Sequence, residues 1–457
     1  MSASVGESLF TGSGTTGREL EYMLSPCSIG TYAREYWGRR PLYVRGHSKK
    51  FANIFDRQRF DRAVANARPK NQDAKIFVRA NFARGTTSSH AHLDPFSISP
   101  EQVPSILAAG GTICVNWINE ADETLDGLAR ALKAQLGHSG PARFNAYLSP
   151  DLAGARMHFD ARIVTTMQIE GTKTWRISRT PAVAWPRSGA VLDADFTASY
   201  VYNDDFRLHL DRRRREEWET PAPFTDGDFE DVTLEAGDLL VLPAGTWHSP
   251  QAQKGASLAI NFACDPLSFS DLLADVLRNA MGSAPSWRSV PPFAPIAPSE
   301  GLTEDLRTYL AARLKEATAA IAAMTPDSPE IVAALGRRIL PPHAADVSGE
   351  ATALDDVSGG APVIERDACL RVSQRTPTLS LISGTAGAQR LMVFTEKSEA
   401  QVASAAVPLI TEILAAKEFR ASDCERWSDL EWPTIRRILQ VLHSIGVLEH
   451  QKGEASR

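Results

Sequence analysis

The chain has 457 residues, with 49 basic and 55 acidic side chains and a formal net charge of −6. At about 150 residues per domain, this length predicts two or three domains, each with its own core. The 43% hydrophobic and 23% charged content is ordinary for a folded protein and excludes collagen-like and wholly disordered classes. The mild negative charge provides no general attraction for nucleic acid.

No stretch of the sequence approaches the roughly 18 apolar residues that a membrane span requires. The first residues also lack the cationic and apolar regions of a signal peptide, so we expect a cytoplasmic protein without membrane contact. The cysteines are odd in number and show no CxxC spacing, which argues against a disulfide framework or a zinc knuckle. Residues 1–18 are rich in Ser, Gly and Thr and are expected to be flexible.

The first large region, residues 19–265, contains many short strand candidates. A helix from Thr31, a break near Gly38 and a strand from Leu42 to Val44 come first. Leucines at helical spacing between Asp122 and Leu136 predict an amphipathic helix. The other strand candidates are residues 112–117, 144–148, 163–169, 174–177, 232–234, 239–242 and 257–262. Short strands with little helix between the later ones predict a sandwich or small barrel rather than a parallel sheet.

The composition changes after this region. Residues 266–345 predict helices, with apolar stripes at 272–277 and 306–321 and a third helix that Ser328-Pro329 opens. A second linker is expected at 346–361. In residues 362–457, Trp432-Pro433 opens a helix that Gly446 ends, and a short strand follows. This order favours a winged-helix domain.

A candidate metal site combines two distant segments. His158 and Asp160 are two residues apart, so on a strand both side chains would project from the same face. The segment LEAGDLLVLPAGTWHSP (234–250) places His248 just beyond a buried strand and a bend. Two histidines and one carboxylate occupy one side of an octahedral ion and leave three positions open. This pattern favours non-haem Fe(II).

A lysine supplies a second part of the pattern. Lys173 is expected to follow a turn at Glu170-Gly171 and to lie with Trp175 on the neighbouring antiparallel strand. A cation directed into the same interior could bind the far carboxylate of a dicarboxylic acid whose near end chelates the metal. The combination indicates 2-oxoglutarate.

These residues resemble the JmjC-type, cupin-like 2-oxoglutarate oxygenases, and within them the ribosomal-oxygenase branch. The matching segments cover the chain from about residue 20 to 265. They are YWGRRPLYVRG (36–46), GGTICVNWINE (110–120), FNAYLSP (144–150), MHFDARIVTTMQIEGTKTWRI (157–177) and LEAGDLLVLPAGTWHSP (234–250).

The resemblance implies an α+β chain with a double-stranded β-helix (jelly-roll) core, a helical dimerisation region and a C-terminal winged helix, hence a homodimer. It implies Fe(II) held by His158, Asp160 and His248, with 2-oxoglutarate and O2 as co-substrates. Lys173 would bind the distal carboxylate of 2-oxoglutarate. The further co-substrate contacts that it implies are Asn145, Tyr147 and, with weaker support, Asn261.

The implied activity is a dioxygenase that hydroxylates an amino-acid side chain of a protein or peptide, either a ribosomal protein or a tailored peptide. One alternative is N-demethylation by the same chemistry. Another is a non-enzymatic, cupin-like metal-binding protein whose winged helix contacts nucleic acid. Direct nucleic-acid binding is not expected, because Arg436-Arg437 is the one compact basic feature of the C-terminal domain.

Several residues also have simpler interpretations. Lys173 could be a solvated lysine, Asn145 and Tyr147 could be structural, and Trp37 and Trp175 are expected to be core aromatics. The stretch between Asp160 and His248 carries surplus residues near 180–225 that would lie beside the site. They include Asp204-Asp205 and Arg212 to Arg215, which fit a solvated helix as well as an anion-binding patch. His90, His92 and His209 have no partner at a meaningful spacing.

Overall fold

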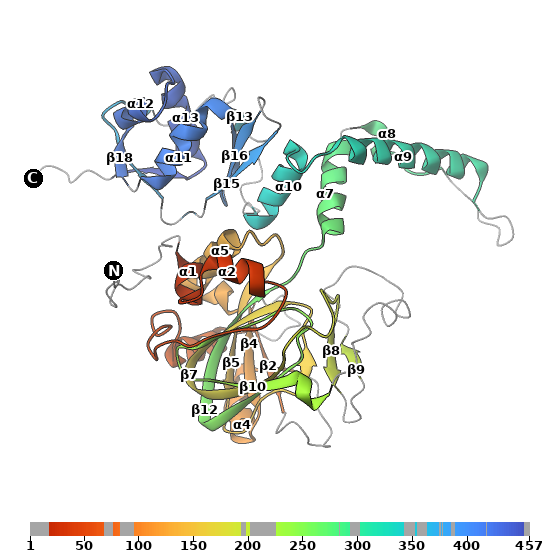
Figure 1. Ribbon diagram of the computed structural model, residues 1–457, viewed down its shortest axis with the longest axis vertical. Helices are drawn as coiled ribbons and strands as arrows, with labels where there is room; N and C mark the ends of the chain where they lie inside the picture. Colours follow the sequence, from red (N-terminus) through yellow and green to blue (C-terminus); the bar gives the residue numbers. More distant parts are fainter. Residues whose placement is uncertain are drawn as a thin grey trace, which may run out of the picture. The chain divides into compact units, whose positions relative to one another are not determined.

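The computed structural model divides the chain into two compact units, Met1–Pro266 and Leu267–Arg457 (Figure 1). The residues it describes are 18–67, 76–82, 96–192, 198–201, 225–282, 284–292, 302–341, 352–353, 363–373, 376, 378–384, 389–416 and 418–451. Several sequence features therefore lie outside the described residues. They are His90, His92, Asp204-Asp205, His209, Arg212 to Arg215, nearly all of the segment 1–18 and most of the linker 346–361.

The first unit is built around one large antiparallel sheet. Its path runs β1-β11-β7-β12-β5-β4-β2-β3, while β10 pairs with β7, and β6 connects β12 through β8 to β9. The strands are β1(Leu42–Val44), β2(Phe77–Asn81), β3(Phe96–Ile98), β4(Thr112–Asn116), β5(Ala142–Ser149), β6(His158–Phe159), β7(Ile163–Ser178), β8(Gly189–Leu192), β9(Ala198–Val201), β10(Phe229–Leu234), β11(Leu239–Leu242) and β12(His248–Cys264). This confirms the α+β class and the absence of a parallel arrangement among these strands, and it is consistent with a jelly roll.

The strands β7 and β12 are longer than the sequence predicts. Residues 163–169 and 174–177 belong to the single strand β7, so the predicted turn at Glu170-Gly171 is wrong. Gly171 adopts a φ of +70°, and a Cβ there would lie 2.1 Å from the carbonyl oxygen of Ala256. The strand bends at this glycine without ending, because β12 pairs with it on both sides of an irregularity between Gln253 and Leu258.

Helices and short helical turns complete the first unit. They are α1(Glu19–Leu24), α2(Ile29–Thr31), a π-helix (Tyr32–Tyr36), α3(Arg57–Asn66), α4(Val103–Ala108), α5(Glu123–Gln135) and the 3-10 turns Pro100–Gln102, Ile118–Ala121 and Asp226–Asp228. The predicted helix between Asp122 and Leu136 is confirmed as α5, and Asp122 caps it by accepting a hydrogen bond from the Leu125 N–H.

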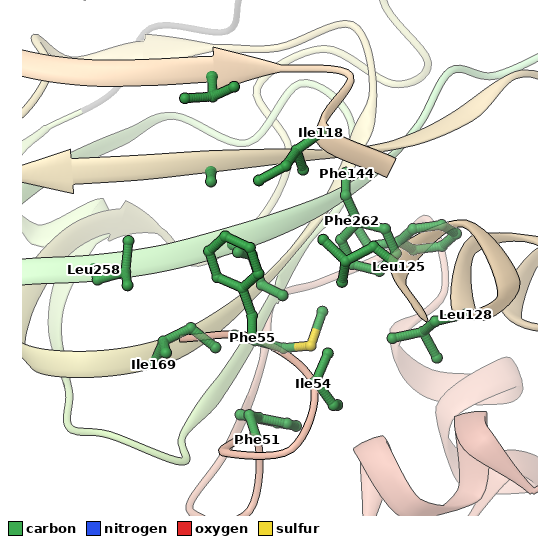
Figure 2. Packing of buried hydrophobic residues seen from close by; sticks show 14 of the residues in the cluster. Phe51, Ile54, Phe55, Ile118, Leu125, Leu128, Phe144, Ile169, Leu258 and Phe262 are labelled. Carbon is green, nitrogen blue, oxygen red and sulfur yellow. The ribbon is translucent and has the colours of Figure 1, made fainter. Parts of the chain in front are cut away.

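The alternation of side chains along β5 determines where a site can form. Phe144, Ala146 and Leu148 are buried in the main core, where Figure 2 shows Phe144 beside Phe262 of β12. Their ring centroids are 5.2 Å apart. Because successive side chains of a strand point to opposite faces, the odd-numbered residues of β5 face away from this core. The polar side chains of Asn145 and Tyr147 therefore share the other face.

The second unit begins with helices. They are α7(Phe269–Met281), α8(Pro285–Arg288), α9(Glu304–Ala323) and α10(Pro329–Ile339), which confirms the three predicted helices. Arg338 of α10 forms an ion pair with Asp275 of α7 at 2.5 Å. Among the described residues of the chain, no helix has both the length and the apolar character of a membrane span.

The rest of the second unit contains two small sheets and three helices. The four-stranded sheet consists, in order, of β13(Thr352–Ala353), β17(Glu399–Ala403), β16(Arg390–Phe394) and β15(Leu379–Ser383). The three-stranded sheet consists of β18(Glu418–Arg420), β14(Cys369–Val372) and β19(Leu448–His450). The helices are α11(Val407–Ala415), α12(Cys424–Trp427) and α13(Trp432–Ser444), with 3-10 turns at Ser404–Ala406 and Ala421–Asp423. The predicted helix after Trp432 and the strand after Gly446 are both present. The winged-helix assignment itself stays a prediction.

Candidate metal centre

The sheet brings His158, Asp160 and His248 together. His158 on β6 lies directly opposite His248, the first residue of β12, and their imidazole centroids are 4.1 Å apart. One ligand atom of each of the three residues lies within 4.8 Å of the others. Asp160 follows the end of β6, so it is the chain immediately after this two-residue strand that brings the carboxylate to the imidazoles. No second cluster of this kind occurs among the residues that the structure describes.

The two histidines are oriented in the same way. Nδ1 of His158 lies 2.7 Å from the carbonyl oxygen of Arg156, and Nδ1 of His248 lies 2.8 Å from that of Thr246. A carbonyl can only accept a hydrogen bond, so each Nδ1 carries a proton, and in the neutral form of each imidazole the lone pair is at Nε2. Backbone contacts of this type fix the tautomer and orientation of metal-binding histidines.

The electrostatics suit a divalent cation. Burial raises the pKa of Asp160, but the neighbouring His158 and Arg162 act against it, and the net pKa is below the ordinary value. Burial, with the charge of His158, lowers the pKa of His248 to about 3. The site therefore offers a carboxylate and a neutral imidazole at His248, a donor set that fits Fe(II) or a similar ion.

Aromatic side chains lie beside His248 or follow the histidines in the sequence. Trp175 is buried, as the core interpretation predicts, and its ring centroid lies 5.8 Å from that of His248. Phe159 packs edge-on against Trp247 at 4.7 Å. Trp37 packs against the main core, again as expected. Trp175 is therefore an apolar neighbour of His248.

Lys173 is buried and not solvated, with 3% of its surface exposed. Its Nζ donates a hydrogen bond of 3.0 Å to Ser149 Oγ, which also accepts one from Thr112 Oγ1. In the described part of the chain, no acidic side chain forms an ion pair with Lys173. Burial lowers the pKa of Lys173 to about 8. A buried ammonium without a carboxylate partner is costly, so this position is suited to an anionic ligand.

The other predicted contacts form a row across the sheet. Asn145 of β5 lies directly opposite Asn261 of β12, which lies opposite Thr166 of β7. Asn145 Oδ1 accepts a hydrogen bond of 3.1 Å from the Trp117 N–H, so part of this side chain has a structural role. Asn261 Oδ1 and Thr166 Oγ1 are buried and have no hydrogen-bond partner within the described residues. Such atoms are available to a ligand after small adjustments.

Tyr147 lies on the same face of β5, two residues after Asn145. It is opposite Cys114 of β4. Burial, with the charges of Cys114 and Asp160, raises the pKa of Tyr147 well above its ordinary value, so the hydroxyl keeps its proton. Tyr147 can therefore donate a hydrogen bond on this face of β5.

The sequence interpretation did not include Ser149, the partner of Lys173. A signal was present, because Ser149 follows Asn145 and Tyr147 at the two-residue spacing of one strand face. Cys114 gave no comparable signal, since its place beside Tyr147 depends on the pairing of β4 with β5. All five cysteines lie in the described part of the chain and are free thiols, as expected.

Comparison with known proteins agrees with this site. Residues 126–272 match the family model of the JmjC domain, so the chain contains a JmjC domain. The match begins within α5 and includes His158, Asp160, Lys173 and His248.

Two of the chain's relatives come from animals. The chain is 25% identical over 234 residues to ribosomal oxygenase 1 of Danio rerio, a match that covers 50% of this chain and 37% of that protein. It is 24% identical over 275 residues to the bifunctional lysine-specific demethylase and histidyl-hydroxylase NO66 of Caenorhabditis elegans, which covers 59% and 32%. The chain thus spans about a third of the length of these two relatives. The names of these two relatives agree with the resemblance of the sequence motifs to the ribosomal-oxygenase branch of the JmjC proteins.

Two further matches are bacterial. The uncharacterized protein YxbC of Bacillus subtilis (strain 168) is 26% identical over 283 residues, which is 61% of this chain and 80% of that protein. The crystal structure of Escherichia coli ribosomal oxygenase YcfD superposes with a TM-score of 0.46 at 14% identity, over 93% of this chain and 98% of that one.

Proposed function

We propose that the protein is an Fe(II)- and 2-oxoglutarate-dependent dioxygenase that hydroxylates an amino-acid side chain of a protein or peptide, such as a ribosomal protein. The observation that carries this proposal is the buried Lys173, which has no acidic partner among the described residues and shares one sheet with the His158, Asp160 and His248 cluster. A protein that bound a metal alone would have no use for a buried cation without a counterion.

Each residue has a defined part in this proposal. His158, Asp160 and His248 would hold Fe(II), and Lys173 with Ser149 would bind the distal carboxylate of 2-oxoglutarate. Tyr147, Asn145 and Asn261 would donate or accept hydrogen bonds along the co-substrate. When bound, iron, 2-oxoglutarate and O2 supply the oxidising power for inserting oxygen into a C–H bond. The chain itself orients the ligands, and Trp175 excludes water beside His248.

The test is an assay of the full chain with Fe(II), 2-oxoglutarate and O2, followed by mass spectrometry of ribosomal-protein peptides. We expect succinate formation that depends on Fe(II), and a peptide that gains one oxygen atom. His47→Ala, at an exposed histidine, is the matched control for the ligand variants. Metal uptake without any consumption of 2-oxoglutarate would instead support a binding protein.

N-demethylation is the second candidate, because one relative carries both activities in its name. It uses the same ligands and co-substrates, so the site residues do not separate the two outcomes. Methylated peptides that lose a methyl group with release of formaldehyde, and gain no oxygen, would support demethylation.

We also propose a domain organisation for the chain: a catalytic domain at 19–265, a dimerising helical region at 266–345 and a winged-helix-like domain at 362–457. The support for dimerisation is α9, a 20-residue helix with no buried residue in the single chain. Leu314 on this helix is 68% exposed and Ile321 is 42% exposed. A homodimer that becomes monomeric in Leu314→Asp, measured by light scattering after gel filtration, would support this arrangement.

A further inference from the structure

A group of side chains lies at the end of the site that is remote from Lys173. Along the site face of β5 the order is Ser149, Tyr147, Asn145 and Arg143, and Ser149 is the residue that binds Lys173. β4 ends at Asn116, and Trp117 follows it. Because Val115 pairs with Ala146, Asn116 continues the register beside Asn145. Asn116, Trp117 and Arg143 thus form the opposite end of the site face.

This end is also close to the candidate metal ligands. The charge of Arg143 acts on Asp160, and the charge of Asp160 acts on Tyr147. Asn145 lies between Arg143 and Tyr147 on the same face of β5. On β5 itself, Ser149, which binds Lys173, lies toward one end of the site face, and Asn116 of β4 lies toward the other.

Trp117 is held in a strained conformation at this position. Its φ is +58°, in the left-handed region that a bulky side chain rarely adopts. Such strain persists only where the surroundings fix it. Here the Trp117 N–H donates to Asn145 Oδ1, and the guanidinium of Arg143 lies 4.6 Å from the centre of the indole ring. Arg143 is itself ion-paired with Asp265.

Asn116 presents a buried amide next to Trp117 in the sequence. Its Nδ2 is buried and has no oxygen or nitrogen acceptor within the described residues, and the neighbouring Cys114 thiol is only a weak acceptor. Other atoms of the side chain are accessible, because the residue is only partly buried. An amide held in this way is suited to a ligand group that accepts a hydrogen bond.

We infer that Asn116 and Trp117 form the subsite for the side chain that is oxidised, and that this side chain is neutral and offers a hydrogen-bond acceptor. The inference rests on the proposed oxygenase function. A methylated ammonium or a guanidinium would normally bind over the face of an aromatic ring. At Trp117 the chain's own Arg143 already covers a ring face, and its charge opposes a second cation.

The test uses two capped amino acids of opposite character. The full chain is loaded with Mn(II) and 2-oxoglutarate, and the NMR line broadening of N-acetylasparagine amide is compared with that of N-acetyl-trimethyllysine amide. We expect the asparagine probe to be broadened more strongly. Asn116→Ala should weaken its broadening about 3- to 10-fold, the effect of one lost hydrogen bond. Asn66→Ala, at an exposed position on α3, should have no effect.

A second variant tests the indole. Trp117→Asn removes the ring while keeping a residue that tolerates the left-handed conformation, and it should weaken the broadening of the asparagine probe. Trp185→Asn is the matched control, because Trp185 also has a positive φ but is 51% exposed. Broadening of the trimethyllysine probe equal to or above that of the asparagine probe would overturn the inference, as would an asparagine signal that Asn116→Ala leaves unchanged or no signal at all.

The relaxation of solvent water by Mn(II) reports whether the chain binds the metal, and so distinguishes failure of the subsite from failure of the proposed function. If the chain binds Mn(II) and 2-oxoglutarate but neither variant alters the asparagine signal, the subsite is wrong and the proposed function stands. If the chain binds no Mn(II), the proposed function itself fails.

Discussion

The two ends of the proposed site differ in how complete they are without a ligand. At the histidine end, the Nδ1 of each histidine donates a hydrogen bond to a backbone carbonyl, and the pKa of Asp160 is held below its ordinary value. At the lysine end, the buried ammonium of Lys173 donates a hydrogen bond to the hydroxyl of Ser149. The first end is pre-organised, whereas the second needs a bound anion to balance its charge. Substitutions at the histidine end should therefore impair metal binding, and substitutions at the lysine end should impair 2-oxoglutarate binding.

The largest effect is expected at the histidine end. His248→Ala removes a ligand from a site with three protein ligands, and it should lower both metal affinity and succinate formation by at least about 100-fold, the upper range seen for loss of supporting contacts. Metal content and succinate are the measurements, with His47→Ala as the control. Retention of wild-type turnover with added iron would show that His248 is not a ligand.

Lys173→Ala should separate the two ends. Loss of a charge-assisted contact to a carboxylate costs about 1.5–3 kcal/mol, so the concentration of 2-oxoglutarate for half-maximal turnover should rise about 10- to 100-fold. Metal affinity measured without 2-oxoglutarate should be unchanged, because Lys173 is not in the ligand cluster. A parallel loss of metal would mean that the two ends are not independent.

The binding of 2-oxoglutarate should depend on pH. The pKa of Lys173 is lowered to about 8 by burial, so the ammonium that would bind the carboxylate is present below this pH and lost above it. Affinity should therefore fall about tenfold per pH unit above pH 8. Titration calorimetry from pH 7 to 9 measures this change. In Lys173→Arg, which stays charged, any remaining affinity should be nearly constant; the same slope in both proteins would assign the titration to another group.

Ser149→Ala should have the smallest effect. It removes the hydroxyl that accepts a hydrogen bond from Lys173, and the affinity for 2-oxoglutarate should fall about 2- to 10-fold. Thr112→Val, which removes the donor to Ser149 and leaves the contact with Lys173 in place, is the comparison variant. An effect of Thr112→Val as large as that of Ser149→Ala would mean that the hydroxyl pair acts as a unit.

Much of the fold could be read from local patterns. The helix α5 follows from leucine spacing and the Asp122 cap, and α13 follows from Trp432-Pro433 and Gly446. Strand continuity could not be read in the same way. The break predicted at Gly171 is absent, because the long partner strand β12 supplies hydrogen bonds on both sides of the bend. A glycine signals where a chain can turn, but pairing decides whether it does.

The sequence alone determined which residues are chemically suited to the site, because His158, Asp160, Lys173 and His248 are conspicuous in type and spacing. It also determined which residues share a strand face, since that period is local. Only the tertiary structure decided that Ser149 receives the ammonium of Lys173 and that the Arg143 guanidinium covers Trp117. Those contacts depend on the packing and register of the folded sheet, where long-range pairing selects one partner from many that the local sequence allows.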